Sequence, residues 1–294
     1  MHILLKYKRF IKFFSLIIIF ALLALIIAKN ATEIYEVYSR KQTICVPIIM
    51  YHQVKNNELG KDVISPYEFE SDLKYLSDSN YHTITMTELI NYVYQDTALP
   101  DNPIILSFDD GYISTYKYVF PLLQEYNMKI VLSIIGKSTD DFSRVIDNHL
   151  TSHLTWKHVK EMEESGLVEI QNHTYNMHKI RNGRYGCGQL CNESLTDYEH
   201  LIADDVTKFE ERIQLMEVAT PNTFTYPYGK YNDNTEQILK KLGYKATLSC
   251  SYGMNLISRD PEKLFGLKRM CRAHNHSLNK LIKEGMETLK YMDK

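Results

Sequence analysis

Short apolar runs alternate with amphipathic segments along most of this 294-residue chain. The runs have the length of strands, and the segments between them carry apolar residues at helical spacing. Seven runs are predicted to be strands: residues 46–52, 103–106, 129–135, 168–170, 224–226, 246–248 and 266–268. Strands that alternate with helices indicate a parallel sheet.

The intervening segments carry the start and stop signals of helices. Residues 65–68 (Ser-Pro-Tyr-Glu) form a capping box with proline at the first helical position, and residues 85–88 (Thr-Met-Thr-Glu) form a second box. Further helices are predicted over residues 114–126, 156–165, 195–218 and 233–242 and from residue 277 onwards, whereas residues 179–194 are predicted to be an irregular loop. About seven strand–helix units predict an α/β fold, a distorted (β/α) barrel that can fall short of eight units.

The first 30 residues differ from the rest of the chain. Four basic residues among positions 6–12 precede an unbroken apolar run from Phe13 to Ala28, which Lys29 closes. This is the pattern of a basic region followed by a membrane-inserting segment. No clear small-residue cleavage site follows, so a transmembrane signal-anchor is favoured over a released signal peptide. The positive charge places the N-terminus in the cytoplasm and the remaining chain outside the cell membrane, or secreted if the segment is cleaved.

Charge and cysteine content narrow the classes of function. Residues 1–29 hold five of the 34 Lys and Arg residues and no acid, so the remainder carries 29 positive and 36 negative charges, a net charge of −7. An acidic domain argues against nucleic acid as a partner. Five scattered cysteines make a disulfide framework unexpected. Cys187 and Cys191 are close enough to form a bridge or bind a metal, although an incidental role is favoured.

Polar side chains with chemical potential follow several predicted strands. His52, the adjacent Asp109 and Asp110, His173 and Tyr228 all fall at or near carboxyl ends of strands, where barrel enzymes carry their active sites. Aspartate and glycine are ordinary turn residues, so an acidic turn is one interpretation of Asp109 and Asp110. The other interpretations are that the pair binds a cation, performs acid/base chemistry or does both.

Asp110, His173 and His178 together predict a metal site. Two imidazoles and one carboxylate suit zinc or another divalent first-row metal and leave positions open for water and substrate. The spacing of the two histidines is too wide for adjacent turns of one helix and fits a loop that surrounds an ion. Either histidine alone is more simply explained as an ordinary surface residue; the neighbouring aspartates favour the metal.

Three motifs in this order resemble the polysaccharide deacetylases (carbohydrate esterase family 4, the NodB homology domain). They are Ser-Phe-Asp-Asp-Gly at residues 107–111, His173-Thr174 with His178, and Phe-Thr-Tyr-Pro-Tyr-Gly at residues 224–229. Residues 46–52 and 154–156 are also similar to the family, and the resemblance covers about residues 46–285. The longer spacing between the histidines is similar to that of the secreted poly-N-acetylglucosamine deacetylases.

The resemblance implies metal-dependent hydrolysis of the N-acetyl group of an amino sugar. It makes Asp109 the general base and Asp110, His173 and His178 the ligands of the metal, which we expect to be zinc, with cobalt or nickel as alternatives. The metal would activate a water, and the backbone N–H of Tyr228 would stabilise the oxyanion.

Two positions depart from the family pattern. The arginine that often opens the third motif is Thr225 here, and Arg269 or Arg272 is the candidate to orient Asp109 instead. The late motif that supplies the general-acid histidine is not recognisable. His274 is the first candidate, followed by His276 and His52, which also lies near the expected substrate position.

The expected organisation is a basic tail and anchor at residues 1–30, a linker at 31–45 and a catalytic domain at 46–294. The leading hypothesis is a deacetylase of an N-acetylglucosamine polymer, either an exopolysaccharide or peptidoglycan. A carbohydrate acetyl-esterase or oligosaccharide deacetylase would use the same site. A non-catalytic carbohydrate-binding barrel is the remaining alternative, which the complete set of Asp109, Asp110, His173 and His178 argues against.

Overall fold

The computed structural model describes residues 43–144 and 152–292, together with residues 17, 18, 20–25, 27 and 29. The chain divides into two compact units, residues 1–43 and residues 44–294. Most of the expected anchor (1–30) and linker (31–45) lies outside the described residues. Within the described part, no helix combines the length and the apolar character needed to cross a membrane.

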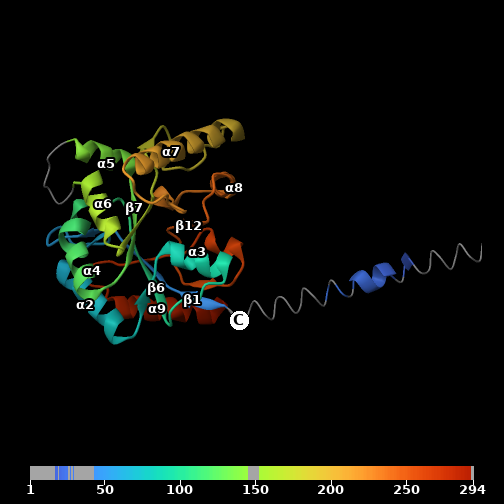
Figure 1. Ribbon diagram of the computed structural model, residues 1–294, viewed down its shortest axis with the longest axis horizontal. Helices are drawn as coiled ribbons and strands as arrows, with labels where there is room; N and C mark the ends of the chain where they lie inside the picture. Colours follow the sequence, from blue (N-terminus) through green and yellow to red (C-terminus); the bar gives the residue numbers. More distant parts are fainter. Residues whose placement is uncertain are drawn as a thin grey trace, which may run out of the picture. The chain divides into compact units, whose positions relative to one another are not determined.

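A curled parallel sheet of seven strands forms the centre of the second unit (Figure 1). The strands occur in the order β12 (Ala246–Leu248), β11 (Thr223–Thr225), β8 (Val168–Asn172), β7 (Ile130–Ile134), β6 (Pro103–Phe108), β2 (Ile48–Tyr51) and β14 (Met270–Cys271). All six pairings between neighbours in this order are parallel, and β5 (His82–Thr83) adds a further parallel pairing to β6. The predicted α/β class and parallel sheet are therefore confirmed.

Residues 267–272 lie against strands near both ends of this order. Leu267 donates its N–H to the carbonyl oxygen of Thr247, just before the end of β12, and Arg272 donates its N–H to that of Met50 in β2, both at 2.9 Å. The strand predicted at residues 266–268 is wrong in position, because only Leu267 forms a bridge there and regular pairing begins at Met270. The sheet therefore curls until residues 267–272 contact both β12 and β2.

Helices surround the sheet: α2 (Pro66–Asp78), α3 (Met86–Gln95), α4 (Phe120–Tyr126), α5 (Gly136–Ser143), α6 (Trp156–Glu164), α7 (Leu195–Leu215), α8 (Asp233–Lys241) and α9 (Leu278–Met292). Both predicted capping boxes are confirmed, at Ser65 and Thr85. Asn232, not the following aspartate, caps α8. A π-helical turn, η1 (Thr115–Val119), precedes α4, and 3-10 turns form η2 (Pro227–Gly229) and η3 (Pro261–Leu264).

Three short two-stranded pairings complete the fold. They are β1 (Ile44–Val46) with β13 (Asn255–Ile257), β3 (Gln53–Val54) with β4 (Val63–Ile64), and the hairpin of β9 (Ile180–Arg181) with β10 (Arg184–Tyr185). The hairpin lies within the loop predicted to be irregular. All five cysteines are free.

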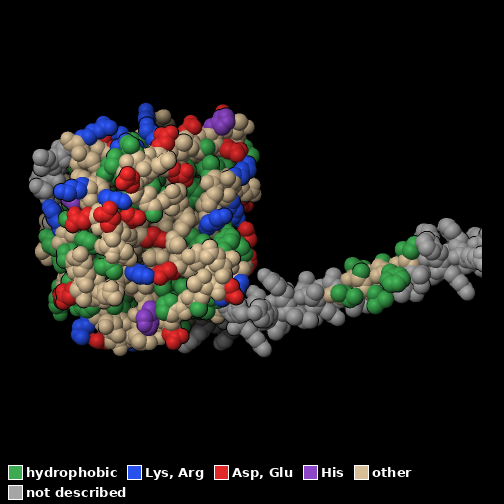
Figure 2. All heavy atoms as spheres, viewed as in Figure 1, with side chains coloured by type: hydrophobic (Ala, Val, Ile, Leu, Met, Phe, Trp, Pro, Cys, Tyr) green, Lys and Arg blue, Asp and Glu red, His purple; other side chains and the backbone are tan. Residues whose placement is uncertain are grey.

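Alternating residues of the strands face two apolar clusters. Ile49, Leu106 and Leu132 belong to the cluster that includes α2, α4, α6 and α9, whereas Ile48 and Ile105 belong to the one that includes α3. All five side chains are fully buried, and burying each one stabilises the fold by about 1.5–3 kcal/mol. On the face seen in Figure 2, basic and acidic side chains are interspersed.

Candidate active site

The two aspartates lie at the turn that follows β6. Asp109 still continues the strand pairing, because its N–H donates to the carbonyl oxygen of Tyr51 at 3.0 Å. Asp110 and Gly111 then adopt φ values of 71° and 76°, a region that favours glycine. A Cβ atom on Gly111 would lie 3.0 Å from the side chain of Ile134, so glycine also allows the close approach of β7. The turn directs the two adjacent carboxylates to different partners.

Asp110 faces both predicted histidines. Its Oδ1 lies 3.4 Å from Nε2 of His173 and 3.2 Å from Nε2 of His178. One ligand atom from each of the three side chains lies within 4.8 Å of the others. His173 Nδ1 lies 2.8 Å from the carbonyl oxygen of Thr225 and donates its proton there, which leaves Nε2 as an acceptor. Two imidazole nitrogens and a carboxylate facing one point form a donor set suited to a divalent metal.

The burial of Asp110 supports the same interpretation. Among the described residues, no hydrogen-bond donor reaches its buried Oδ1 atom, and such an acceptor is costly unless something binds it. Burial acts to raise the pKa of Asp110, but the neighbouring His173 and His178 outweigh it and hold the pKa well below its usual range. Asp110 is therefore an ionised carboxylate with a free lone pair, which fits a metal ligand.

The loop between the two histidines is held by hydrogen bonds from outside it. Thr174 has a φ of 70°, and its N–H donates to Oδ1 of Asn172 at 2.7 Å. The carboxylate of Asp205, on α7, accepts the N–H groups of Tyr175 and Asn176 at 2.7 and 2.8 Å. The residues between His173 and His178 are thus fixed in position by α7.

Asp109 is paired with a fully buried arginine. Arg269 donates from Nη1 to Oδ1 of Asp109 at 2.7 Å and from Nη2 to Oδ2 at 2.8 Å. The same guanidinium donates to Oγ of Ser107 and to the carbonyl oxygen of Ser249. Burial acts to raise the pKa of Asp109, but the charge and hydrogen bonds of Arg269 outweigh it and the pKa is lowered. Arg272, the other candidate, binds Asp72 instead.

A cavity of about 420 Å³ brings most of the predicted site residues together. Its lining includes His52, Asp109, Asp110, His173, His178 and Tyr228. The ring of Tyr228, which is 42% exposed, lies 4.6 Å from the ring of His178, and its backbone has a φ of 56°. The cavity is large enough for a sugar residue.

The histidines considered as general acids lie in different places. His52 lines the cavity, and its Nδ1 atom is buried without a hydrogen-bond partner, 3.9 Å from Oδ1 of Asp62. His274 is not among the lining residues, and its Nδ1 atom lies 2.8 Å from Oε2 of Glu68. His276 contacts Glu284 on α9. The structure therefore does not bring His274 or His276 to the site.

Sequence reasoning missed Asp205, Tyr112 and Cys250. Tyr112 and Cys250 line the cavity, and burial together with the charge of Asp110 raises the pKa of Tyr112 to about 12, so it stays a neutral donor. Tyr112 directly follows the acidic turn, so its position in the sequence indicates a place near the site. No local pattern distinguishes Asp205 from its neighbours on α7.

Comparisons with known proteins identify the family of this chain. A model of the polysaccharide deacetylase family matches residues 96–247. The chain is 25% identical over 257 residues to the poly-β-1,6-N-acetyl-D-glucosamine N-deacetylase of Escherichia coli K12, which covers 80% of this chain and 38% of that protein. The protein of the same name from Staphylococcus aureus MRSA252 is 26% identical over 207 residues, covering 70% and 66%. The chain thus spans less than half of the E. coli relative.

Solved structures share the fold. IcaB from Ammonifex degensii superposes with a TM-score of 0.68 at 22% identity, covering 83% of this chain and 97% of that one. A de-N-acetylase from Aggregatibacter actinomycetemcomitans gives a TM-score of 0.69 at 24% identity, covering 82% and 99%.

Proposed function

Because this chain belongs to the polysaccharide deacetylase family, we propose that it hydrolyses N-acetyl groups of an N-acetylglucosamine polymer. The family resemblance expected from the three motifs is confirmed. The observation that carries the proposal is a single cavity that holds Asp109, paired with Arg269, beside the group of Asp110, His173 and His178. Relatives named as poly-β-1,6-N-acetyl-D-glucosamine deacetylases favour an exopolysaccharide over peptidoglycan.

Asp110, His173 and His178 would hold a divalent metal, which we propose to be zinc, with cobalt or nickel as alternatives. When bound there, such a metal would supply Lewis-acid chemistry, which polarises a carbonyl and makes a water more acidic. The three side chains place that chemistry at the base of the cavity, next to Asp109. The hydrogen bond from His173 to Thr225 fixes the tautomer that such a ligand needs.

Asp109 acts as the general base. Its carboxylate accepts a proton from the attacking water while the water oxygen forms a bond to the acetyl carbon. Arg269 keeps this carboxylate ionised and oriented, since the guanidinium binds both of its oxygens. The backbone N–H of Tyr228 is our candidate to stabilise the negative charge that develops on the carbonyl oxygen.

His52 donates the proton that the departing amine requires. When the carbon–nitrogen bond breaks, the sugar nitrogen must gain a proton, and the donor must lie within reach of the cavity. His52 lines that cavity and its Nδ1 atom has no hydrogen-bond partner among the described residues, whereas His274 is bound to Glu68. The products are acetate and a glucosamine unit in the polymer.

The same site could instead hydrolyse a carbohydrate acetyl ester or a short oligosaccharide. A non-catalytic carbohydrate-binding barrel is the third alternative.

We further propose that the curled sheet is the distorted barrel of this family. Residues 1–30 would anchor it in the cell membrane with the catalytic domain outside the cell. Fractionation of cells that express the full chain, with protease treatment of intact cells, tests this location.

The proposed reaction is tested by acetate release. The purified chain, supplied with zinc, cobalt or nickel, is incubated with poly-N-acetylglucosamine, peptidoglycan and chitin oligomers, and free acetate is measured. We expect release from poly-N-acetylglucosamine and a large loss in the variant Asp109→Asn. An absence of acetate with every polymer and metal would refute the proposal.

A further inference from the structure

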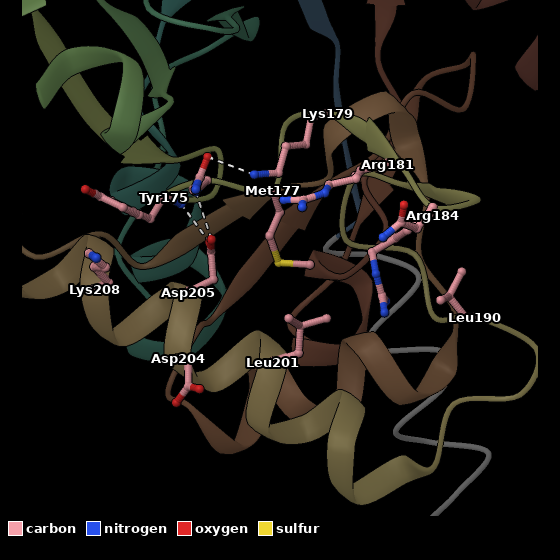
Figure 3. Close-up of a pocket in the computed structure, with 13 residues that line it drawn as sticks. Tyr175, Met177, Lys179, Arg181, Arg184, Leu190, Leu201, Asp204, Asp205 and Lys208 are labelled. Atoms are coloured by element: carbon pink, nitrogen blue, oxygen red, sulfur yellow. Dashed lines mark hydrogen bonds between the residues drawn. The ribbon is translucent and has the colours of Figure 1, made fainter. Parts of the chain in front are cut away.

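A second cavity, of about 520 Å³, lies between α7 and the segment from Tyr175 to Leu190 (Figure 3). It shares no lining residue with the cavity that contains the aspartates. Tyr175, Asn176 and Met177 line this second cavity, whereas the flanking His173 and His178 line the first. The loop from His173 to His178 therefore lines both cavities.

The lining combines an apolar surface with hydrogen-bonding groups. Met177, Leu190 and Leu201 contribute the apolar part, and in Figure 3 Leu201 rises from α7 toward Met177. Asn176 and Asn182 contribute amide groups that both donate and accept hydrogen bonds. An apolar surface with a few convergent polar groups is the usual character of a small-molecule site, and the volume lies within the usual range of about 300–1,000 Å³.

Two of the charged lining residues already have hydrogen-bond partners. Arg184 donates to both carboxylate oxygens of Glu193 at 3.0 and 2.6 Å. Asp205 accepts the backbone N–H groups of Tyr175 and Asn176. The charge of Arg184 is therefore paired, whereas Asp205 keeps its negative charge in the cavity.

The remaining charges leave the cavity positive. Within the part of the chain that the structure describes, Lys179, Arg181 and Lys208 have no ion pair, and the carboxylates of Asp204 and Asp205 also line the cavity. Lys179 donates only to the amide of Asn176, at 3.2 Å, and Lys208 lies 4.9 Å from the ring centre of Tyr175. The three positive and two negative side chains give a net charge of +1, within a domain whose sequence is acidic overall.

We propose that this second cavity binds an acidic sugar, a pyranose ring that carries a carboxylate or a phosphate. Lys179, Arg181 and Lys208 supply the charge-assisted hydrogen bonds that an anionic group accepts. Met177 and Leu201 pack against the apolar face of the ring, and Asn182 and Asp204 bind its hydroxyl groups. This choice of a sugar rests on the proposed function, in which the first cavity acts on a carbohydrate.

Three sugars that share the same pyranose ring and differ in charge test the proposal: glucose, glucuronic acid and glucose 6-phosphate. Binding to the purified full chain is measured by saturation-transfer NMR at low salt. We expect at least one acidic sugar to bind about tenfold more tightly than glucose, and the two acidic ligands distinguish carboxylate from phosphate. The double variant Lys179→Ala/Arg181→Ala should reduce this binding to the level of glucose, and 0.5 M salt should weaken it.

Lys157→Ala/Lys283→Ala is the matched control, because both lysines are exposed and lie outside the cavity. It should leave binding unchanged. Equal binding of all three sugars, or binding that survives in Lys179→Ala/Arg181→Ala, would overturn the proposal. Asp109→Asn should abolish acetate release and retain the acidic sugar, so failure of this site and failure of the proposed reaction give different results.

Discussion

Arg269 binds both carboxylate oxygens of Asp109, although the two residues are 160 positions apart in the sequence. Both side chains are buried, with 0% and 3% of their surface exposed. A buried pair of this kind holds a charge in a fixed orientation, and removing one partner leaves the other charge uncompensated. The ionised state of the proposed base therefore depends on a residue that directly precedes the last strand of the sheet.

Arg269→Lys should raise the pKa of Asp109. A lysine keeps the charge but loses the two parallel hydrogen bonds, and burial then favours the protonated carboxyl more strongly. A base must be ionised, so activity is lost as the pH falls through its pKa. The acidic limb of the pH profile of kcat/KM should move to higher pH by about 1 unit.

Arg212→Lys is the control for this experiment, because Arg212 pairs with Asp140 outside the cavity. Its profile should match that of the unchanged protein. An acidic limb that stays in place in Arg269→Lys would mean that Arg269 does not set the ionisation of the base.

Asp109→Asn and Asp110→Asn should fail for different reasons. Asp109→Asn should lower kcat by about 10²–10⁴-fold and still bind one equivalent of zinc, because only the proton acceptor is removed. Asp110→Asn should lose most of its zinc, because it removes the one anionic ligand. Treatment with a chelator should inactivate the unchanged protein, and added zinc, cobalt or nickel should restore it. Metal content measured beside acetate release separates these outcomes; equal metal loss in both variants would contradict the division of roles.

Asp205→Asn should weaken metal binding without a change in any predicted ligand. An amide oxygen cannot replace both carboxylate oxygens that accept the N–H groups of Tyr175 and Asn176. Loss of an outer hydrogen bond of this kind typically lowers metal affinity by about 10–100-fold. Competition with a chromophoric chelator measures this affinity directly.

Asp204→Asn is the matched control. Asp204 precedes Asp205 in the sequence, its carboxylate is exposed, and no hydrogen bond to it is found among the described residues. It should bind metal normally. If Asp205→Asn lowers the melting temperature of the metal-free protein but leaves metal affinity intact, the role of Asp205 is in folding alone.

Glu68→Gln should make stability less sensitive to acid. Burial acts to raise the pKa of Glu68, but hydrogen bonds from Ser65, His274 and Asn275 outweigh it and lower the pKa to about 2. Ionised Glu68 therefore stabilises the folded state above its ordinary pKa, and this contribution is lost as the pH falls from about 5 toward 2. Glutamine preserves the capping box but cannot change its charge.

Urea unfolding between about pH 6 and pH 3.5 measures this difference. The free energy of unfolding should fall less steeply with acid in Glu68→Gln than in the unchanged protein, while the change at neutral pH stays within ~1 kcal/mol. Identical slopes would show that the charge of Glu68 makes no contribution.

Local patterns account for most of what could be predicted. Strand β6 and the acidic turn are visible in the sequence because an apolar run ends in two carboxylates and a glycine. The capping boxes at Ser65 and Thr85 are complete within four residues. His173 and His178 were chosen for their chemistry, and the structure places both beside Asp110. Each of these signals lies within a few neighbouring positions.

Pairings between distant segments could not be predicted in the same way. The sequence left Arg269 and Arg272 as equal candidates, because two similar cations lie near each other after the same loop. Only the register of the last strand directs Arg269 to Asp109 and Arg272 to Asp72. His274 was favoured as the acid for its place in the sequence, but the fold binds it to Glu68. Packing in three dimensions decides such partners.

Residues 267–272, which contact both β12 and β2, have a consequence for biosynthesis. A nascent chain completes most of its strands before the ribosome has made Arg269, and until then Asp109 has no counter-ion in an apolar interior. The turn that bears the two aspartates can reach its final ionisation state only after the last strand is inserted. A chain that ends before Arg269 would therefore lack the counter-ion of the proposed base.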